Sequence, residues 1–114
     1  QSQAAAVIAA NPDLNGYLCC DASGPIGIAN AIREAGKQDQ IMAVGMDNLI
    51  EILEAVQDGS LKGTSSTLPQ EQGMFAVLMM LQAANGMPTP AVVDTGIGWY
   101  VPGEELDAAI EAMK

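Results

Sequence analysis

The sequence predicts an α/β protein with a doubly wound parallel sheet, because short apolar segments alternate with longer helical ones along its 114 residues. The apolar segments begin near residues 17, 41, 62 and 92, and one stretch with helical spacing separates each from the next. Residues 41–46 form a nearly continuous apolar run, which is typical of a strand buried on both faces of a parallel sheet. No internal repeat or low-complexity stretch favours another fold class.

The first elements have clear starts and ends. Residues 1–10 have the apolar composition of the second half of a helix, which the sequence Asn11-Pro12-Asp13 ends. Residues 17–20 then predict the first strand. Pro25 suits the first turn of the next helix, where its missing N–H costs nothing, and Gly36 supplies a left-handed end.

The second strand leads into a helix whose limits are also marked. Asn48 and Glu51 have the spacing of a capping box at its start, and Gly59 ends it. The apolar side chains between these residues lie on one face. A third, less apolar strand is expected at about residues 61–66.

The last third of the chain repeats the strand–helix alternation. Pro69 starts a helix whose eight-residue apolar run, residues 74–81, should be largely buried. Asn85-Gly86 ends this helix, and a last strand is expected at about residues 92–101. The closing helix carries apolar side chains at four- and three-residue steps: Leu106, Ile110 and Met113.

Charge and composition exclude several classes of function. Fourteen acidic residues against four basic ones give a net charge of −10, which disfavours binding to nucleic acid or to anionic membrane surfaces. The chain contains no His, so it lacks the commonest general base and the commonest metal ligand. We therefore expect no enzyme activity, no metal site and no cofactor.

The two cysteines, Cys19 and Cys20, are adjacent and end the first predicted strand. Neighbouring residues on a strand point to opposite faces, so a disulfide bond between them is disfavoured. We interpret both as buried, inert thiols rather than as a redox site.

Polar side chains follow three of the predicted strands. Asp21 and Ser23 follow the first, Asp47 and Asn48 the second, and Thr67 the third. Ligands of open α/β sheets bind beyond the carboxyl ends of the strands, so these residues are the candidate binding site. The alternative is that each is only a helix cap.

The chemistry of this candidate site is that of a hydrogen-bond acceptor. Its two carboxylates, its hydroxyls and its amide come without any Arg, Lys or His. Carboxylates accept strong hydrogen bonds from hydroxyl groups and repel phosphate or carboxylate ligands. A neutral sugar or polyol fits best, and a cation or amine fits second. Asp21 and Asp47 as a catalytic acid–base pair is the weaker alternative, because no nucleophile elbow, phosphate loop or metal cluster accompanies them.

Several segments together resemble the C-terminal lobe of ribose-type periplasmic binding proteins of ABC transporters (type I periplasmic binding proteins). They are NPDLNGYLCCDASGPIGIANAIREAGK, IMAVGMDN, EAVQDGSLKGTSSTLPQEQG and VVDTGIGWYVPGEEL. The resemblance implies two α/β lobes joined by three hinge strands, with a sugar enclosed between the lobes. It also implies export to the periplasm, or lipid anchoring outside the cell, and docking on a membrane permease.

The resemblance also assigns roles position by position. Asp21 falls where the family typically has an Asn that bonds the sugar, and Asp47 matches the family's ligand-binding Asp. Thr67 falls where ribose-type proteins have a Gln that contacts ligand near a hinge crossing, and Thr95-Gly96 resembles the last crossing. The departures at positions 21 and 67 put ribose itself in question, and a carboxylate at 21 favours a ligand richer in donors, such as a polyol. The sequence Asp21-Ala22-Ser23 with a nearby Pro also resembles the rhamnose and autoinducer-2 branch of the family.

On this interpretation, residues 1–114 are one partial C-terminal lobe, and the N-terminal lobe, the start of this lobe and any export signal are missing. We then expect the isolated chain to dimerise or to pair with the missing N-terminal portion, because a sheet without its neighbours exposes an edge and apolar surface. The alternative family is the effector-binding domain of LacI-type transcription regulators. Residues 36–40, before the second strand, and the helix that follows it have the transporter pattern instead.

Overall fold

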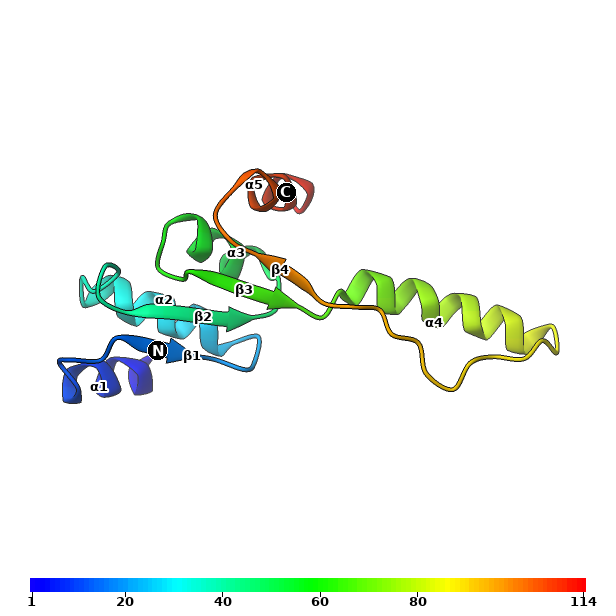
Figure 1. Cartoon of the computed structure of the whole chain (residues 1–114), viewed down its shortest axis with the longest axis horizontal. Coiled ribbons are helices and arrows are strands. Elements are labelled where there is room, and N and C mark those ends of the chain that lie inside the picture. The colour runs from blue at the N-terminus through cyan, green and yellow to red at the C-terminus, as the bar shows by residue number, and fades with distance from the viewer. The chain divides into compact units, whose positions relative to one another are not determined.

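The structure, a computed structural model, describes residues 1–114 and alternates helices with strands along the whole chain (Figure 1). This order confirms the predicted α/β class. The elements are α1 (Ser2–Ala10), β1 (Gly16–Leu18), α2 (Gly24–Glu34), β2 (Met42–Met46), α3 (Ile50–Gln57), β3 (Gly63–Ser66), α4 (Pro69–Ala84), β4 (Gly98–Tyr100) and α5 (Glu104–Ala112). None of the helices is both long enough and apolar enough to span a membrane.

The chain forms two compact units. The first contains residues 1–65 and 99–114, and the second contains residues 66–98. The first unit holds the sheet and four of the helices, whereas the second holds α4 and the segment that follows it.

The sheet is open and has the strand order β1-β2-β3-β4. β1 pairs with β2 in parallel, with Leu18 opposite Val44, and β2 pairs with β3 in parallel, with Val44 opposite Gly63. This arrangement confirms the predicted parallel sheet. It also brings the carboxyl ends of these strands to one edge of the sheet.

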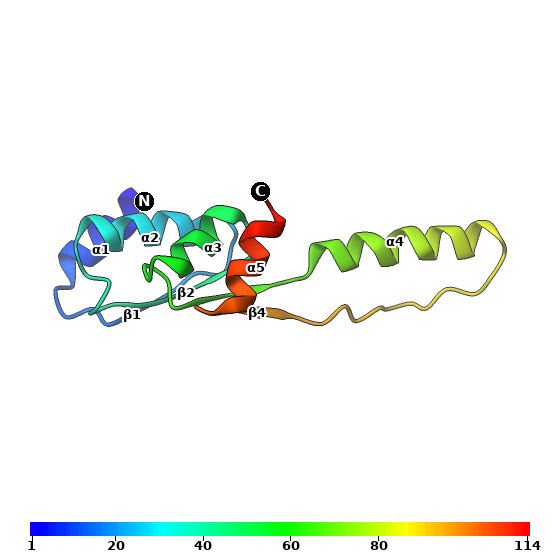
Figure 2. The same ribbon diagram turned by 90° about the horizontal axis from the view of Figure 1, so that it is seen from above.

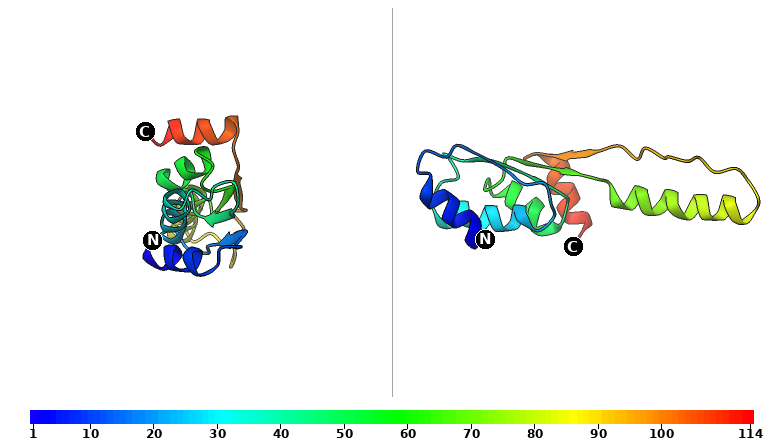
Figure 3. Two further views of the ribbon diagram at one scale, coloured as in Figure 1. Left: turned by 90° about the vertical axis from the view of Figure 1, so that its left-hand side faces the viewer. Right: turned by 90° about the horizontal axis from the view of Figure 1, so that it is seen from below.

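The helices of the first unit all lie on one face of the sheet, as Figures 2 and 3 show. In a doubly wound sheet helices cover both faces, whereas the helices of this unit cover one. On the other face the side chains of Leu18, Met42 and Trp99 are more than half exposed. The core between the helices and the sheet consists of aliphatic side chains, with Ile32, Ile41, Ala43, Ile52, Leu53, Val56 and Leu61 fully buried.

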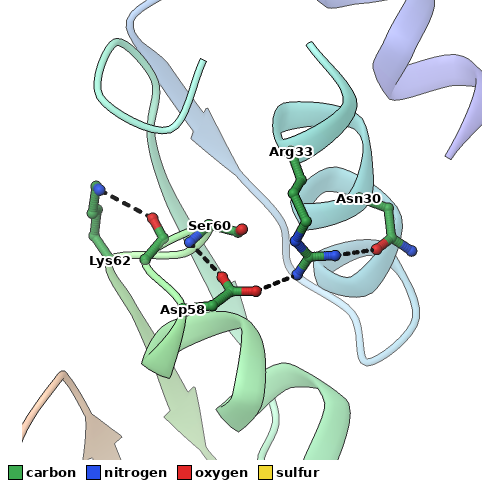
Figure 4. A network of polar contacts seen from close by, with 6 residues as sticks. Asn30, Arg33, Asp58, Ser60 and Lys62 are labelled. Carbon is green, nitrogen blue, oxygen red and sulfur yellow. Dashed lines mark hydrogen bonds and ion pairs between the residues drawn. The ribbon is translucent and has the colours of Figure 1, made fainter. Parts of the chain in front are cut away.

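A polar network joins α2 to the end of α3 (Figure 4). Arg33 donates through Nη2 to Oδ2 of Asp58 at 2.6 Å and through Nη1 to Oδ1 of Asn30 at 2.7 Å. The other oxygen of Asp58 accepts the backbone N–H of Ser60 at 2.8 Å. Partial burial raises the pKa of Asp58, but the hydrogen bonds from Ser60 and the ion pair with Arg33 outweigh it, so the pKa is lowered overall.

The helix ends confirm some sequence predictions and correct one. Gly36 (φ 63°) and Gly59 (φ 82°) lie in the left-handed region just beyond α2 and α3, as predicted. The predicted capping box of Asn48 and Glu51 is wrong. Leu49 occupies the N-cap position of α3 and no side chain caps the helix, because the chain turns at Asp47 and becomes helical only at Ile50.

The second unit departs from the sequence prediction at two places. No residue of α4 is buried, although the run at residues 74–81 was expected to be. Within this unit α4 is accompanied only by an irregular segment, which is too small to cover an apolar helix face. The strand predicted at residues 92–101 is also shorter, since β4 begins at Gly98 and the residues before it have no strand to pair with in their unit.

Candidate functional site

The loop between β1 and α2 is organised by the carboxylate of Asp21. Its Oδ1 accepts the backbone N–H groups of Ser23 (2.8 Å) and Gly24 (2.6 Å) and the hydroxyl of Ser23 (3.1 Å). The N–H of Gly24 lowers the pKa of Asp21 most, followed by the hydroxyl and the N–H of Ser23. Asp21 is therefore an exposed, ionised acceptor that also satisfies backbone groups at the start of α2.

The loop between β2 and α3 is organised by Asp47, whose backbone is strained. Its φ of 86° is in the left-handed region, where a residue with a side chain is uncommon outside functional loops and turns. Two bonds from β3 hold this conformation, since Asp47 donates its N–H to the carbonyl of Ser65 (2.6 Å) and accepts the hydroxyl of Thr64 on its own carbonyl (2.7 Å). Oδ1 of Asp47 accepts the N–H of Asn48 at 2.8 Å.

Four of the five predicted site residues lie in the first unit, in the loops that follow β1 and β2. Because these strands are adjacent and parallel, their loops emerge at the same edge of the sheet. Asp21 and Ser23 are exposed, Asp47 is half-buried, and Asn48 is buried with 9 % of its surface exposed. Asp21, Ser23 and Asp47 are thus the accessible members of this group.

The fifth predicted residue, Thr67, belongs to the second unit. It is exposed, directly follows β3, and its carbonyl oxygen accepts the side-chain amide of Gln72 at 2.5 Å. The next residue, Leu68, has a left-handed backbone (φ 53°) and donates its N–H to Oγ of Ser66. The assignment of Thr67 to the site stays a prediction.

Sequence reasoning missed two residues that shape these loops. Thr64 is fully buried and supports the backbone of Asp47, a role that its position in the third strand could have suggested. Cys19 places its Sγ against Gly24, at the point where a side chain on that glycine would lie. Nothing in the composition of the first strand pointed to this contact. The prediction that both cysteines are buried is wrong, since Cys20 is exposed and Cys19 is half-buried.

The charges near the two loops are negative. All four basic side chains are engaged elsewhere: Arg33 with Asp58, Lys37 with the carbonyl of Pro12, Lys62 with that of Gly59, and Lys114 with Glu111. No group of three or more His, Cys, Asp or Glu residues could hold a metal ion. The loops therefore offer hydrogen-bond acceptors to a ligand and no partner for an anionic group.

An open parallel sheet with polar groups in the loops at its carboxyl edge is the arrangement in which α/β proteins of the doubly wound class bind their ligands. Residues 1–88 match the periplasmic binding protein domain, and the chain belongs to that family. This confirms the resemblance found in the sequence.

Known relatives of the chain bind sugars. The chain is 30% identical over 94 residues to the D-ribose/D-allose-binding protein of Pseudomonas aeruginosa, covering 82% of this chain and 29% of the relative. An ABC transporter solute-binding protein from Agrobacterium vitis with bound D-fucose is 30% identical with a TM-score of 0.83, covering 88% of this chain and 34% of that one. A second ABC transporter solute-binding protein from Agrobacterium vitis, bound to α-D-tagatopyranose, is 26% identical with a TM-score of 0.85. This match covers 97% of this chain and 37% of that one. The chain thus spans about a third of the length of these proteins.

Proposed function

We propose that the protein containing this chain is the solute-binding component of an ABC importer. It binds a sugar or polyol between two lobes in the periplasm and delivers it to a membrane permease, without catalysing a reaction. Most of residues 1–114 then contribute part of its C-terminal lobe. The observation that carries this proposal is the pair of carboxylates, Asp21 and Asp47, at the carboxyl edge of a sheet of this family, with every basic side chain engaged elsewhere.

Asp47 is the residue on which the proposed site depends most. Its backbone is held by two hydrogen bonds in a conformation that costs about 1–3 kcal/mol, which the surrounding structure must offset. Such a fixed carboxylate suits the recognition of sugar hydroxyls, because little side-chain and loop freedom remains to be lost on binding. Asp21 contributes a second acceptor, with Ser23 and Asn48 beside the two carboxylates and Thr67 following β3.

The division of the chain into two units supports the two-lobed arrangement. The second unit begins at Ser66, next to Thr67, and ends at Gly98, close to Thr95-Gly96. The resemblance implies hinge crossings at those two places. We propose that the chain leaves the C-terminal lobe and returns to it there.

The uncovered apolar surface supports a partner for this chain. Helix α4 has no buried residue, and the sheet face opposite the helices exposes large apolar side chains. Apolar surface of this extent is normally covered by another part of the protein or by another chain. We propose the remaining N-terminal portion of the same protein as the partner, and a dimer when the chain is isolated.

Calorimetry on the full-length protein with D-allose, D-ribose, D-fucose and sorbitol tests the proposal. Asp47→Asn keeps the side chain's shape and tolerates a left-handed backbone, so its loss of affinity reports the charge. We expect about 1.5–3 kcal/mol weaker binding, or roughly 10- to 150-fold. Asp39→Asn, an exposed substitution before the opposite end of β2, is the matched control and should bind like the unmodified protein.

Two results would contradict the proposal. Binding of one sugar with unchanged affinity in Asp47→Asn would remove Asp47 from the site. No binding of any sugar or polyol, with specific DNA binding by the full-length protein, would favour the effector domain of a regulator instead.

A further inference from the structure

Helix α4 is apolar around its whole circumference. Residues 73–81 contain no polar side chain, and a stretch of this length makes about two and a half turns of an α-helix. The helix carries one charged side chain, Glu71, and none of its residues is buried. A surface helix normally has a polar face, whereas a helix that is apolar on every side is normally covered on every side. α4 therefore requires more than one partner surface.

One side of α4 faces the segment that follows the helix. This segment runs back beside α4 (Figures 1 and 2). Phe75, Ala76 and Met79 line a shared hollow with Val93 and Thr95, and Phe75 and Met79 are half-buried. The segment has the sequence of a strand but no strand to pair with in its unit. We expect a sheet in the rest of the protein to pair with it and to cover this side of α4.

The opposite side of α4 carries a second apolar surface, which we call the outer stripe. It consists of four side chains with the spacing i, i+3, i+4 and i+7, each between 47% and 56% exposed: Met74, Val77, Leu78 and Leu81. At about 100° per residue, the outer stripe is centred roughly 150° from the side that faces the following segment. One sheet covers one side of a helix. A sheet that includes the following segment therefore leaves the outer stripe uncovered.

The distribution of charge favours a second copy of the protein as the partner of the outer stripe. The chain carries a net charge of −10, so two copies repel each other over most of its surface. The second unit contains only two charged residues, Glu71 and Asp94. Two copies can therefore approach through this unit with little repulsion. A charged peptide, a nucleic acid or a lipid headgroup finds no cluster of opposite charge there.

We propose that two copies of the full-length protein form a dimer in which their outer stripes pack antiparallel about a two-fold axis. The axis passes between Val77 and Leu78, so that Met74 of one copy packs against Leu81 of the other. The stripe is self-complementary in this arrangement, as a two-fold interface requires. The dimer does not depend on sugar binding.

The position of Glu71 favours the antiparallel orientation. In the antiparallel pair the two Glu71 residues lie about 20 Å apart along the helix axes. Salt screens exposed charges beyond about 8–10 Å, so their repulsion is weak at this separation. Parallel packing in register would place the two carboxylates side by side.

Sedimentation equilibrium of the full-length protein tests the dimer. Two helices of this length make an interface at the lower end of the size range of specific complexes, so we expect a Kd on the order of 10–100 μM. Leu78→Glu places two like charges beside the axis and should weaken the dimer at least about 10-fold. Gln70→Glu is the matched control, because it adds the same charge at an exposed position of the same helix, where the two added charges lie at opposite ends of the pair. It should dimerise like the unmodified protein.

Disulfide cross-linking tests the orientation. The background replaces Cys19, Cys20 and any other native cysteine by serine. Leu78→Cys lies beside the axis and should link two copies on oxidation. Met74→Cys should not, because its two copies are separated by about 10 Å along the helix axes, beyond the Cα separation of about 4.4–6.8 Å that a disulfide allows. Equal cross-linking of the two variants would indicate parallel packing and contradict the proposed arrangement.

A full-length protein that stays monomeric at millimolar concentration would overturn the proposal. The urea stability of Leu78→Glu then distinguishes the other partners of the outer stripe. A variant less stable than Gln70→Glu would show that the rest of the same protein covers the stripe, and equal stability would leave the stripe to a different protein. Absence of sugar binding in a dimeric protein would count against the proposed function alone.

Discussion

The hydroxyl of Thr64 donates a hydrogen bond of 2.7 Å to the backbone carbonyl of Asp47, and it does so from a fully buried position on β3. Together with the bond from the N–H of Asp47 to the carbonyl of Ser65, it satisfies both backbone groups of a residue whose φ is 86°. Strand β3 therefore fixes the backbone position from which the side chain of Asp47 extends. Thr64 is not itself a candidate ligand contact, but it supports Asp47, which we propose to bind the ligand.

Thr64→Val should destabilise the protein, because it removes the hydroxyl while keeping the shape of the side chain. The carbonyl of Asp47 then loses its donor, at a cost of about 1–3 kcal/mol in the free energy of unfolding. Urea denaturation measures the change. Thr64→Ser keeps the hydroxyl and loses one methyl group, so it should cost about 1 kcal/mol. Equal stability of Thr64→Val and the unmodified protein would mean that the bond contributes nothing.

Substitutions at Asp47 should reveal its backbone strain. Asp47→Gly and Asp47→Ala both remove the carboxylate, but alanine in the left-handed region is less favourable by roughly 1–2 kcal/mol. We expect the glycine variant to be the more stable of the two by that amount in urea denaturation. Asp39, which is exposed and has no positive φ, is the matched control. There the alanine variant should be the more stable, by about 0.4–1 kcal/mol.

The pKa of Asp21 should lie below its ordinary value of 3.8, because the N–H of Gly24 and the groups of Ser23 favour the carboxylate. A lowered pKa in the folded protein means that the stability contributed by Asp21 is present above pH 3.8 and is lost as the pH falls through the folded-state pKa. Carbon NMR of the Asp21 carboxyl group measures the midpoint. Ser23→Ala should raise it toward 3.8. A midpoint at or above 3.8 in the unmodified protein would show that these bonds do not form.

The sequence predicted the alternation of elements and the strand-end position of the site because both depend on local chemistry. Gly36 and Gly59 mark helix ends that only a residue without a side chain adopts easily, and both have positive φ. Asp21 and Asp47 follow their strands directly, so their placement at the carboxyl edge required only the parallel sheet. These predictions needed no knowledge of distant contacts.

The remaining features depend on tertiary structure. The apolar composition of Cys19 and Cys20 suggested a longer strand, but pairing with β2 sets the end of β1 at Leu18. The spacing of Asn48 and Glu51 suggested a cap, but the turn at Asp47 moves the start of α3. Likewise, the apolar run of α4 indicates that a helix face needs covering and does not identify what covers it.

Gly45→Ala should destabilise the contact between β2 and α2. A Cβ at position 45 would lie 2.8 Å from Cβ of Pro25 and 2.9 Å from its Cγ. The proline ring is rigid and buried at the start of α2, so the helix would have to move away from the sheet. Overpacking of this kind costs about 1–3 kcal/mol, which thermal or urea unfolding measures.

Gly16→Ala is the matched control on the neighbouring strand, because no atom lies within 4 Å of its added Cβ and its φ is not positive. It should leave stability unchanged or raise it by about 0.4–1 kcal/mol. Since Pro25 lies at the start of the helix whose first turn is bonded by Asp21, Gly45→Ala should also move the amide resonances of the Asp21 loop, and Gly16→Ala should not. Equal stability of the two variants would show that α2 can shift without cost, and the Asp21 loop would then be less firmly held than these contacts indicate.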